Sequence, residues 1–103
     1  MSVTYVIGFD VVPDQRDRFL NLLNGVLEAM GTEKHFHRTF LHVDPKNENR
    51  FLLYETWESH EDVLDVQLQR PYRNAWHAAL PELLNGPRDV SVWEPLKEIP
   101  ART

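Results

Sequence analysis

The chain has 103 residues, 42% of them hydrophobic and 11% aromatic, which is typical of one globular domain and not of a disordered chain. Its formal net charge is −5 and Lys and Arg form no run, so nucleic acid and anionic membrane surfaces are not expected partners. The absence of cysteine excludes disulfides, thiolate metal sites and a cysteine nucleophile. The N-terminus "MSVTYVIGFD" lacks the features of a signal peptide, and no apolar run approaches the ~20 residues of a membrane span, so we expect a soluble, cytoplasmic protein.

The first predicted element is a strand over 3–12, rich in β-branched and aromatic residues. Alternation gives it one apolar face, formed by Val3, Tyr5, Ile7, Phe9 and Val11. Pro13 stops this strand, and Asp14 is the expected N-cap of the helix that follows. Apolar residues recur along that helix at three- and four-residue steps: Phe19, Leu22, Leu23, Val26, Leu27 and Met30. Gly31 is expected just beyond its C-terminal end.

Two further strands are predicted over 35–43 and 50–57, joined by the turn-forming stretch "DPKNEN". Ser59 is placed to cap a short helix, and Pro71 suits the first turn of another. The second of these helices carries an apolar stripe of Tyr72, Ala75, Trp76, Ala79, Leu80, Leu83 and Leu84. A final strand, "DVSVWEP", precedes a polar C-terminal tail.

The element order β-α-β-β-α-α-β predicts an α+β fold of the ferredoxin-like, split β-α-β type, with helices on one face of a four-stranded antiparallel sheet. We expect a single domain over 1–97 and a tail over 98–103. The other sheet face would carry Val6, Phe36 and Phe40, and the chain has no further element to cover it. A second copy packed sheet against sheet is the economical solution, so the sequence predicts a homodimer.

The stretch "RFLLYETWES", followed by a capped helix and then by "RPYRNAWHAALPELL", resembles the antibiotic biosynthesis monooxygenase family. The resemblance covers residues 3–96, and its most specific part is Glu-x-Trp-Glu-Ser at 55–59. It implies a ferredoxin-like fold that pairs into a dimeric α/β barrel. The activities it implies include cofactor-independent oxygenation of quinols and polyketide aromatics, and haem degradation in one branch.

The sequence also departs from branches of this family. The haem-degrading branch is similar in using an Asn, a Trp and a His, but here the first two positions fall on Ile7 and on Val66 or Gln67, and only His77 has a counterpart. Many members that act on small quinols have histidines where this chain has Gln67 and Tyr72. The resemblance therefore implies a protein that works without haem, and we expect no cofactor.

The stretch "HFHRTFLH" holds three of the five histidines. In a strand, His35 and His37 would share a face and His42 would point the other way, so the strand alone does not supply three ligands to one metal. The favoured interpretation is a half-exposed strand surface rather than a metal site. The alternative is that His35 or His37 lines a pocket between sheet and helices, where an imidazole could transfer a proton.

The leading functional hypothesis is a monooxygenase that binds a small aromatic quinol-type or polyketide-like molecule and O₂. His77, at the edge of the apolar stripe, is either a partly solvated boundary residue or the residue that accepts a phenolic proton, and Tyr72 is the expected hydrogen-bond donor. Candidate substrate-binding residues are Tyr5, Phe9, His37, Tyr54, Trp57, Gln67, Arg73 and Trp76, with Arg73 as an electrostatic partner of a phenolate. Glu55 is interpreted as a hydrogen-bonding group at a strand end and Glu58 as a surface residue. The rival hypothesis is a non-catalytic dimeric module that binds a small ligand, which Gln67 and Tyr72 favour.

Overall fold

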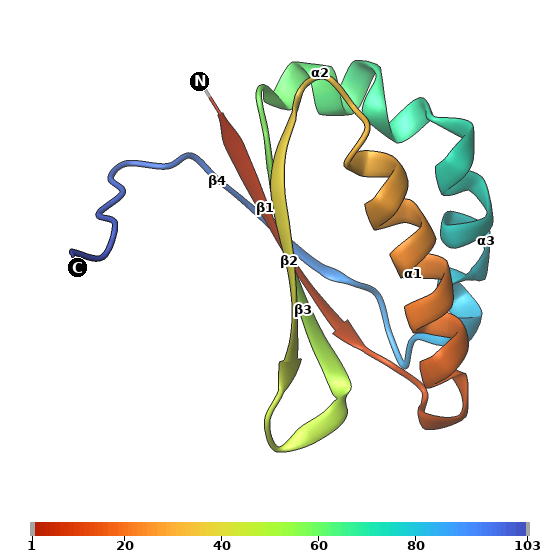
Figure 1. Cartoon of the computed structure of the whole chain (residues 1–103). Helices are drawn as coiled ribbons and strands as arrows, with labels where there is room; N and C mark the ends of the chain where they lie inside the picture. The colour runs from red at the N-terminus through yellow and green to blue at the C-terminus, as the bar shows by residue number, and fades with distance from the viewer. Residues whose placement is uncertain (1, 103) are drawn as a thin grey trace.

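The computed structural model describes residues 2–102, and within this range the chain forms an α+β fold of ferredoxin-like topology. The strands are β1 (Val3–Asp10), β2 (Phe36–Asp44), β3 (Asn47–Trp57) and β4 (Asp89–Trp93). They form one antiparallel sheet in the order β2-β3-β1-β4. The helices are α1 (Arg16–Met30), α2 (His60–Asp65) and α3 (Asn74–Leu83), with 3₁₀ turns at Pro13–Gln15, Gln67–Gln69 and Pro71–Arg73. Figure 1 shows the helices packed on one face of the sheet, so the predicted fold class is confirmed.

The hydrophobic core lies between this sheet face and the helices. The predicted apolar face of β1 is buried along its whole length, from Val3 to Val11. Helix α1 contributes Phe19, Leu23, Val26 and Met30, which are also buried as its spacing predicts. Aromatic rings fill the centre, with Phe19 5.0 to 5.5 Å from the rings of Phe51, Phe9 and Trp76. Such large rings bury much apolar surface and orient the neighbouring elements.

Local signals at the helix ends were only partly reliable. The side chain of Ser59 accepts a hydrogen bond from the backbone N–H of Asp62 at 3.1 Å, so the predicted cap of α2 is confirmed. The prediction for Asp14 was wrong, because residues 13–15 first form a 3₁₀ turn and α1 begins at Arg16 without a side-chain cap. The helix ends at Met30 as expected, and Gly31 follows it in a right-handed conformation.

The helical stripe predicted after Pro71 needs correction. Residues 71–73 form a separate 3₁₀ turn, in which each residue turns by about 120° and not by 100°, so the side chains do not continue the spacing of α3. Ala75 is consequently exposed, whereas Arg73 is buried with 6% of its surface accessible. The rest of the stripe, including Trp76, Ala79 and Leu83, is buried or half-buried.

A bulge in β2 reverses one prediction about the sheet. Phe36 pairs with Trp57 and Arg38 pairs with Thr56, so His37 is an extra residue without a partner position. Phe36 therefore points toward the core, where its ring lies 5.1 Å from that of Trp57, and not toward the outer face as predicted. Phe40, beyond the bulge, does lie on the outer face, with 54% of its surface exposed.

The outer face of the sheet remains open within residues 2–102. Exposed large side chains on it are Phe40, Leu52, Tyr54 and Trp93. Figure 1 shows the C-terminal segment extending away from the sheet on the side opposite the helices, and residues 94–102 form no helix or strand. Because this apolar face is uncovered, we continue to predict that the protein forms a homodimer. None of the helices between residues 2 and 102 combines the length and apolar character needed to cross a bilayer.

Candidate active site

A cavity of ≈ 290 Å³ lies between the inner face of the sheet and the helices. Its walls are mainly apolar, with residues from strands β1, β3 and β4 and from helices α1, α2 and α3. The polar or titratable side chains on its surface are Tyr5, Glu55, His60, Arg73, His77 and Arg88. An apolar cavity with a few convergent polar groups is the usual form of a small-molecule site.

The sheet side of the cavity is organised by a pair of directly opposed residues. Tyr5 on β1 and Glu55 on β3 are register partners, so both side chains leave the sheet on the same face. Glu55 is buried and accepts a hydrogen bond from Nε1 of Trp57 at 3.2 Å. The Tyr5 hydroxyl is hydrogen-bonded to Nδ1 of His60, at the start of α2, over 2.5 Å. This bond ties β1 to the helical layer at one wall of the cavity.

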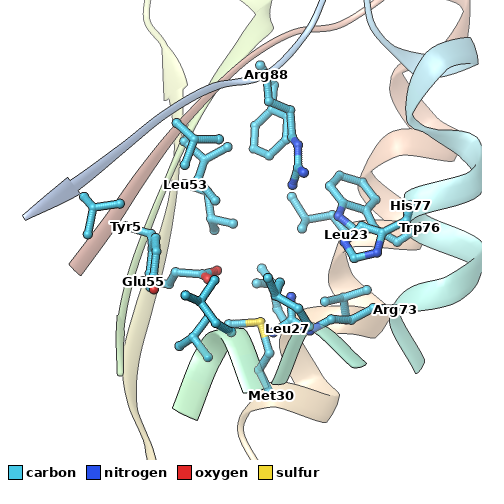
Figure 2. A pocket seen from close by; sticks show the side chains of 18 of the residues that line it. Tyr5, Leu23, Leu27, Met30, Leu53, Glu55, Arg73, Trp76, His77 and Arg88 are labelled. Atoms are coloured by element: carbon cyan, nitrogen blue, oxygen red, sulfur yellow. The ribbon is translucent and has the colours of Figure 1, made fainter. Parts of the chain in front are cut away.

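The helical side supplies the nitrogen-bearing groups. Trp76 and His77 come from α3, Arg73 from the turn before it, and Arg88 from the connection to β4. Figure 2 shows Arg88 pointing into the cavity, with Glu55 facing the helices from the opposite wall. The guanidinium carbon of Arg73 lies over two aromatic rings, 5.9 Å from the centre of Trp57 and 5.6 Å from that of Tyr72.

Burial and charge shift the titration of several of these groups. Burial lowers the pKa of His77, and the positive charges of Arg88 and Arg73 lower it further, so the imidazole is neutral at neutral pH. Burial raises the pKa of Glu55, although Arg73, the Trp57 hydrogen bond and Arg88 act in the opposite direction. Burial also raises the pKa of the Tyr5 phenol, with smaller contributions from Glu55 and Glu61. The site thus holds a neutral base, a protonated phenol and a buried carboxyl group within one apolar cavity.

The structure brings some of the predicted site residues together. Tyr5, Phe9, Arg73, Trp76 and His77 all line the cavity. His77 is half-buried in the first half of α3, so it both lines the cavity and lies close to the surface. Phe9 and Trp76 meet edge to face, with ring centres 5.7 Å apart, and form part of the apolar wall.

The remaining predicted residues do not line this cavity. The Tyr72 hydroxyl donates to Oε2 of Glu33 at 3.2 Å, and the Gln67 amide donates to Oδ2 of Asp62 at 3.1 Å.

Trp57 is fully buried behind Glu55 and Arg73. Tyr54 lies on the outer sheet face and His37 is exposed at the bulge in β2.

Sequence reasoning missed three members of the site. Glu55 was expected to form a hydrogen bond at the strand end, which it does, but it also faces the cavity. Its position directly opposite Tyr5 depends on the β1–β3 register, which the sequence did not specify. His60 and Arg88 carried no periodic signal, because they lie at a helix start and in a loop.

The histidine-rich stretch is dispersed in the structure. His35 precedes β2 and its Nδ1 donates to Oε2 of Glu58 at 2.5 Å, which agrees with the interpretation of Glu58 as a surface residue. His37 occupies the bulge, and His42 lies on the outer face near Phe40. Among residues 2–102, no group of three or more His, Asp or Glu side chains is arranged to hold a metal ion.

The fold and the cavity together define a small-molecule-binding α+β domain of ferredoxin-like topology. Residues 2–79 match the family model for antibiotic biosynthesis monooxygenase, and the chain belongs to this family. The family and its relatives support a monooxygenase activity in general terms.

Individual proteins and solved structures are similar to this chain. A protein of Pestalotiopsis microspora described as a monooxygenase is 28% identical over 93 residues, which are 89% of this chain and 78% of that protein. The structure of Rv0793 from Mycobacterium tuberculosis is similar with a TM-score of 0.86 and 26% identity, over 95% of this chain and 98% of that one. SnoaB from Streptomyces nogalater, a cofactor-independent oxygenase, shares the fold with a TM-score of 0.82 at 19% identity, over 97% and 98% of the two chains.

Proposed function

We propose that the protein is a cofactor-independent monooxygenase that oxidises a small aromatic quinol-type or polyketide-like molecule with O₂. The observation that carries this proposal is the apolar cavity of ≈ 290 Å³ with its few polar groups. A cavity of about 150 Å³ holds one benzene ring, so this one suits a substrate of one or two rings. Family membership and the description of SnoaB as a cofactor-independent oxygenase support the same reaction class.

The proposed chemistry begins with loss of a phenolic proton. His77 is the proton acceptor, because its lowered pKa keeps the imidazole neutral and it lines the cavity. Arg73 and Arg88 stabilise the resulting phenolate, whose electrons then pass to O₂. One oxygen atom enters the ring and the other leaves as water, with all the electrons supplied by the substrate. Tyr5 replaces Tyr72 as the proposed hydrogen-bonding residue, because Tyr5 lines the cavity and Tyr72 does not.

The residues at the positions of the haem-degrading branch favour chemistry without haem. Ile7 presents an apolar side chain to the cavity, and Gln67 is buried with its amide on Asp62. Ile7 lacks the side-chain amide of the Asn that the resemblance to that branch would require, and neither Val66 nor Gln67 has the aromatic ring of the Trp.

Oxygen uptake with isotopically labelled O₂ tests the proposal. Chelator-treated protein without added flavin or haem is given hydroquinone or 1,4-naphthohydroquinone, and the product is analysed by mass spectrometry. One labelled oxygen atom in the ring and one equivalent of O₂ consumed are expected. A simple oxidase would give unlabelled quinone and hydrogen peroxide, which would contradict the proposal.

The rival function, a non-catalytic ligand-binding module, is favoured by one observation. Both residues that stand where many quinol-oxidising members have histidine make internal contacts, Gln67 with Asp62 and Tyr72 with Glu33. Quinols that bind but consume no O₂ beyond their uncatalysed oxidation would establish this function.

A further inference from the structure

The side chain of Arg73 has an unusual environment. Only 6% of the surface of Arg73 is exposed. Its Nε and Nη2 atoms are buried without a hydrogen-bond partner among residues 2–102. More than nine in ten buried polar groups in proteins have a partner, since leaving one unpaired costs free energy. Unpaired N–H groups on a guanidinium are more costly still, because the group carries a full charge.

The two unpartnered atoms lie on the same edge of the guanidinium group. Nε–H and one N–H of Nη2 point in parallel directions and form the fork that binds both oxygens of a carboxylate. The guanidinium carbon lies over the rings of Trp57 and Tyr72, and the Nε–Nη2 edge is the part of the group that has no partner. Arg73 lines the cavity, and Figure 2 shows its nitrogen-bearing end directed toward the interior.

The charge balance of the cavity favours an anion in the same place. Arg73 and Arg88 face one carboxyl group, Glu55, and neither arginine is within ion-pair distance of it in the described chain. Burial lowers the pKa of Arg88, and the positive charge of Arg73 lowers it further, while Glu55 acts in the opposite direction. A bound anion would relieve the repulsion between the two arginines and satisfy the Arg73 fork.

We propose that the substrate of this cavity is an aromatic acid, whose carboxylate binds the Nε–Nη2 edge of Arg73 with Arg88 as a second cationic contact. This inference deepens the proposed function and rests on the cavity being the substrate site. The volume of ≈ 290 Å³ accommodates a carboxylate in addition to a hydroxylated ring. The phenolic hydroxyl groups then lie toward His77 and Tyr5, which line the same cavity.

Calorimetric titration under anaerobic conditions tests this inference without turnover. The probes are 2,5-dihydroxybenzoate, its neutral carboxamide of nearly equal shape, and hydroquinone. The acid is expected to bind about 10- to 100-fold more tightly than the amide, the range of hydrogen bonds to charged groups. Arg73→Gln and Arg88→Gln should each reduce this preference to less than about threefold, because an amide side chain lacks the charge. Arg18→Gln is the matched control and should keep the full preference, because Arg18 is exposed on α1, pairs with Glu82 and does not line the cavity.

If Arg73→Gln does not fold, Arg88→Gln and Arg73→Lys still test the inference. Arg88 lies in a loop, and lysine keeps the charge of Arg73 while losing the fork, so Arg73→Lys should show an intermediate preference. Equal affinity for acid and amide, absence of binding by both at millimolar concentration, or a preference that survives both glutamine variants would overturn the inference. Oxygen uptake with neutral hydroquinone but no preference for the acid would overturn this inference and leave the proposed function intact. Tight binding of the acid without any oxygen uptake would support this inference and overturn the proposed function.

Discussion

The hydroxyl of Tyr5 and Nδ1 of His60 are hydrogen-bonded over 2.5 Å, although the residues are 55 positions apart. The bond joins the middle of the sheet to the first residue of α2 at the wall of the cavity. It therefore holds a phenol from the sheet and an imidazole from the helical layer in one arrangement, next to Glu55.

The Tyr5–His60 bond is expected to stabilise the fold measurably. In a double-mutant cycle with Tyr5→Phe and His60→Ala, urea unfolding should show a coupling of about 0.5–1.5 kcal/mol, the net value of a typical hydrogen bond. Additive effects of the two substitutions would mean that the bond contributes nothing in solution.

His77→Ala is expected to reduce turnover by about 10²-fold, the lower end for loss of a general base. The free energy of unfolding should change by less than about 1 kcal/mol, because His77 lies at the boundary of the core and not within it. Since its pKa is lowered from 6.5, wild-type activity should rise with pH through a value below 6.5 and then level off. The variant should lack this inflection.

Full activity of His77→Ala with an unchanged pH profile would place the proton acceptor elsewhere in the cavity, with His60 as the next candidate. Global unfolding of the variant would show instead that His77 has a structural role.

Tyr72→Phe should leave turnover within about threefold of the wild type and lower the unfolding free energy by about 1 kcal/mol, the value of one hydrogen bond. The reason is that its hydroxyl is bonded to Glu33, while the ring that supports Arg73 is retained. A large loss of turnover in steady-state assays would restore Tyr72 to the hydrogen-bonding role predicted from the sequence.

Glu55→Gln is expected to be more stable than the wild type at neutral pH but not at low pH. Burial raises the folded-state pKa of Glu55 above its ordinary 4.5, so the folded protein holds this proton more strongly than the unfolded chain. Below the ordinary value both states are protonated and the two proteins should be equally stable. As the pH rises the unfolded carboxyl group ionises first, and the wild type loses stability until the folded-state pKa is passed.

Thermal unfolding of both proteins across this pH range measures the difference directly. Glutamine keeps an oxygen acceptor for Nε1 of Trp57, so the hydrogen bond that Glu55 accepts at 3.2 Å can form in both proteins. The comparison therefore isolates the ionisation of Glu55. A melting-temperature difference that does not depend on pH would show that Glu55 titrates normally.

The predicted homodimer should have a light-scattering mass of about twice the 12.1 kDa of the monomer. Phe40→Glu places a charge on the exposed outer face, on the edge strand β2, and should give the monomer mass, because a charge buried in the interface would lack a partner. Ala75→Glu adds the same charge on the exposed side of α3 and should leave the mass unchanged. A monomeric wild-type protein at micromolar concentration would contradict the prediction.

Periodicity predicted the elements and most of the core, since both depend on neighbours in the chain. The alternation in β1, the stripe in α1 and the Ser59 cap all appear where they were expected. The prediction was wrong where a local irregularity of the backbone changed the direction in which neighbouring side chains point. The bulge at His37 turned Phe36 inward, and the 3₁₀ turn before α3 buried Arg73 in place of Ala75.

By itself, the sequence determined the fold class, the family resemblance and part of the cavity wall, including Tyr5, Trp76 and His77. Only the tertiary structure decided which polar groups meet there. Glu55 faces Tyr5 because of strand register, His60 reaches the Tyr5 hydroxyl across 55 residues, and Arg88 enters from a loop. These relationships depend on contacts between distant segments, for which the spacing of residues along one element carries no information.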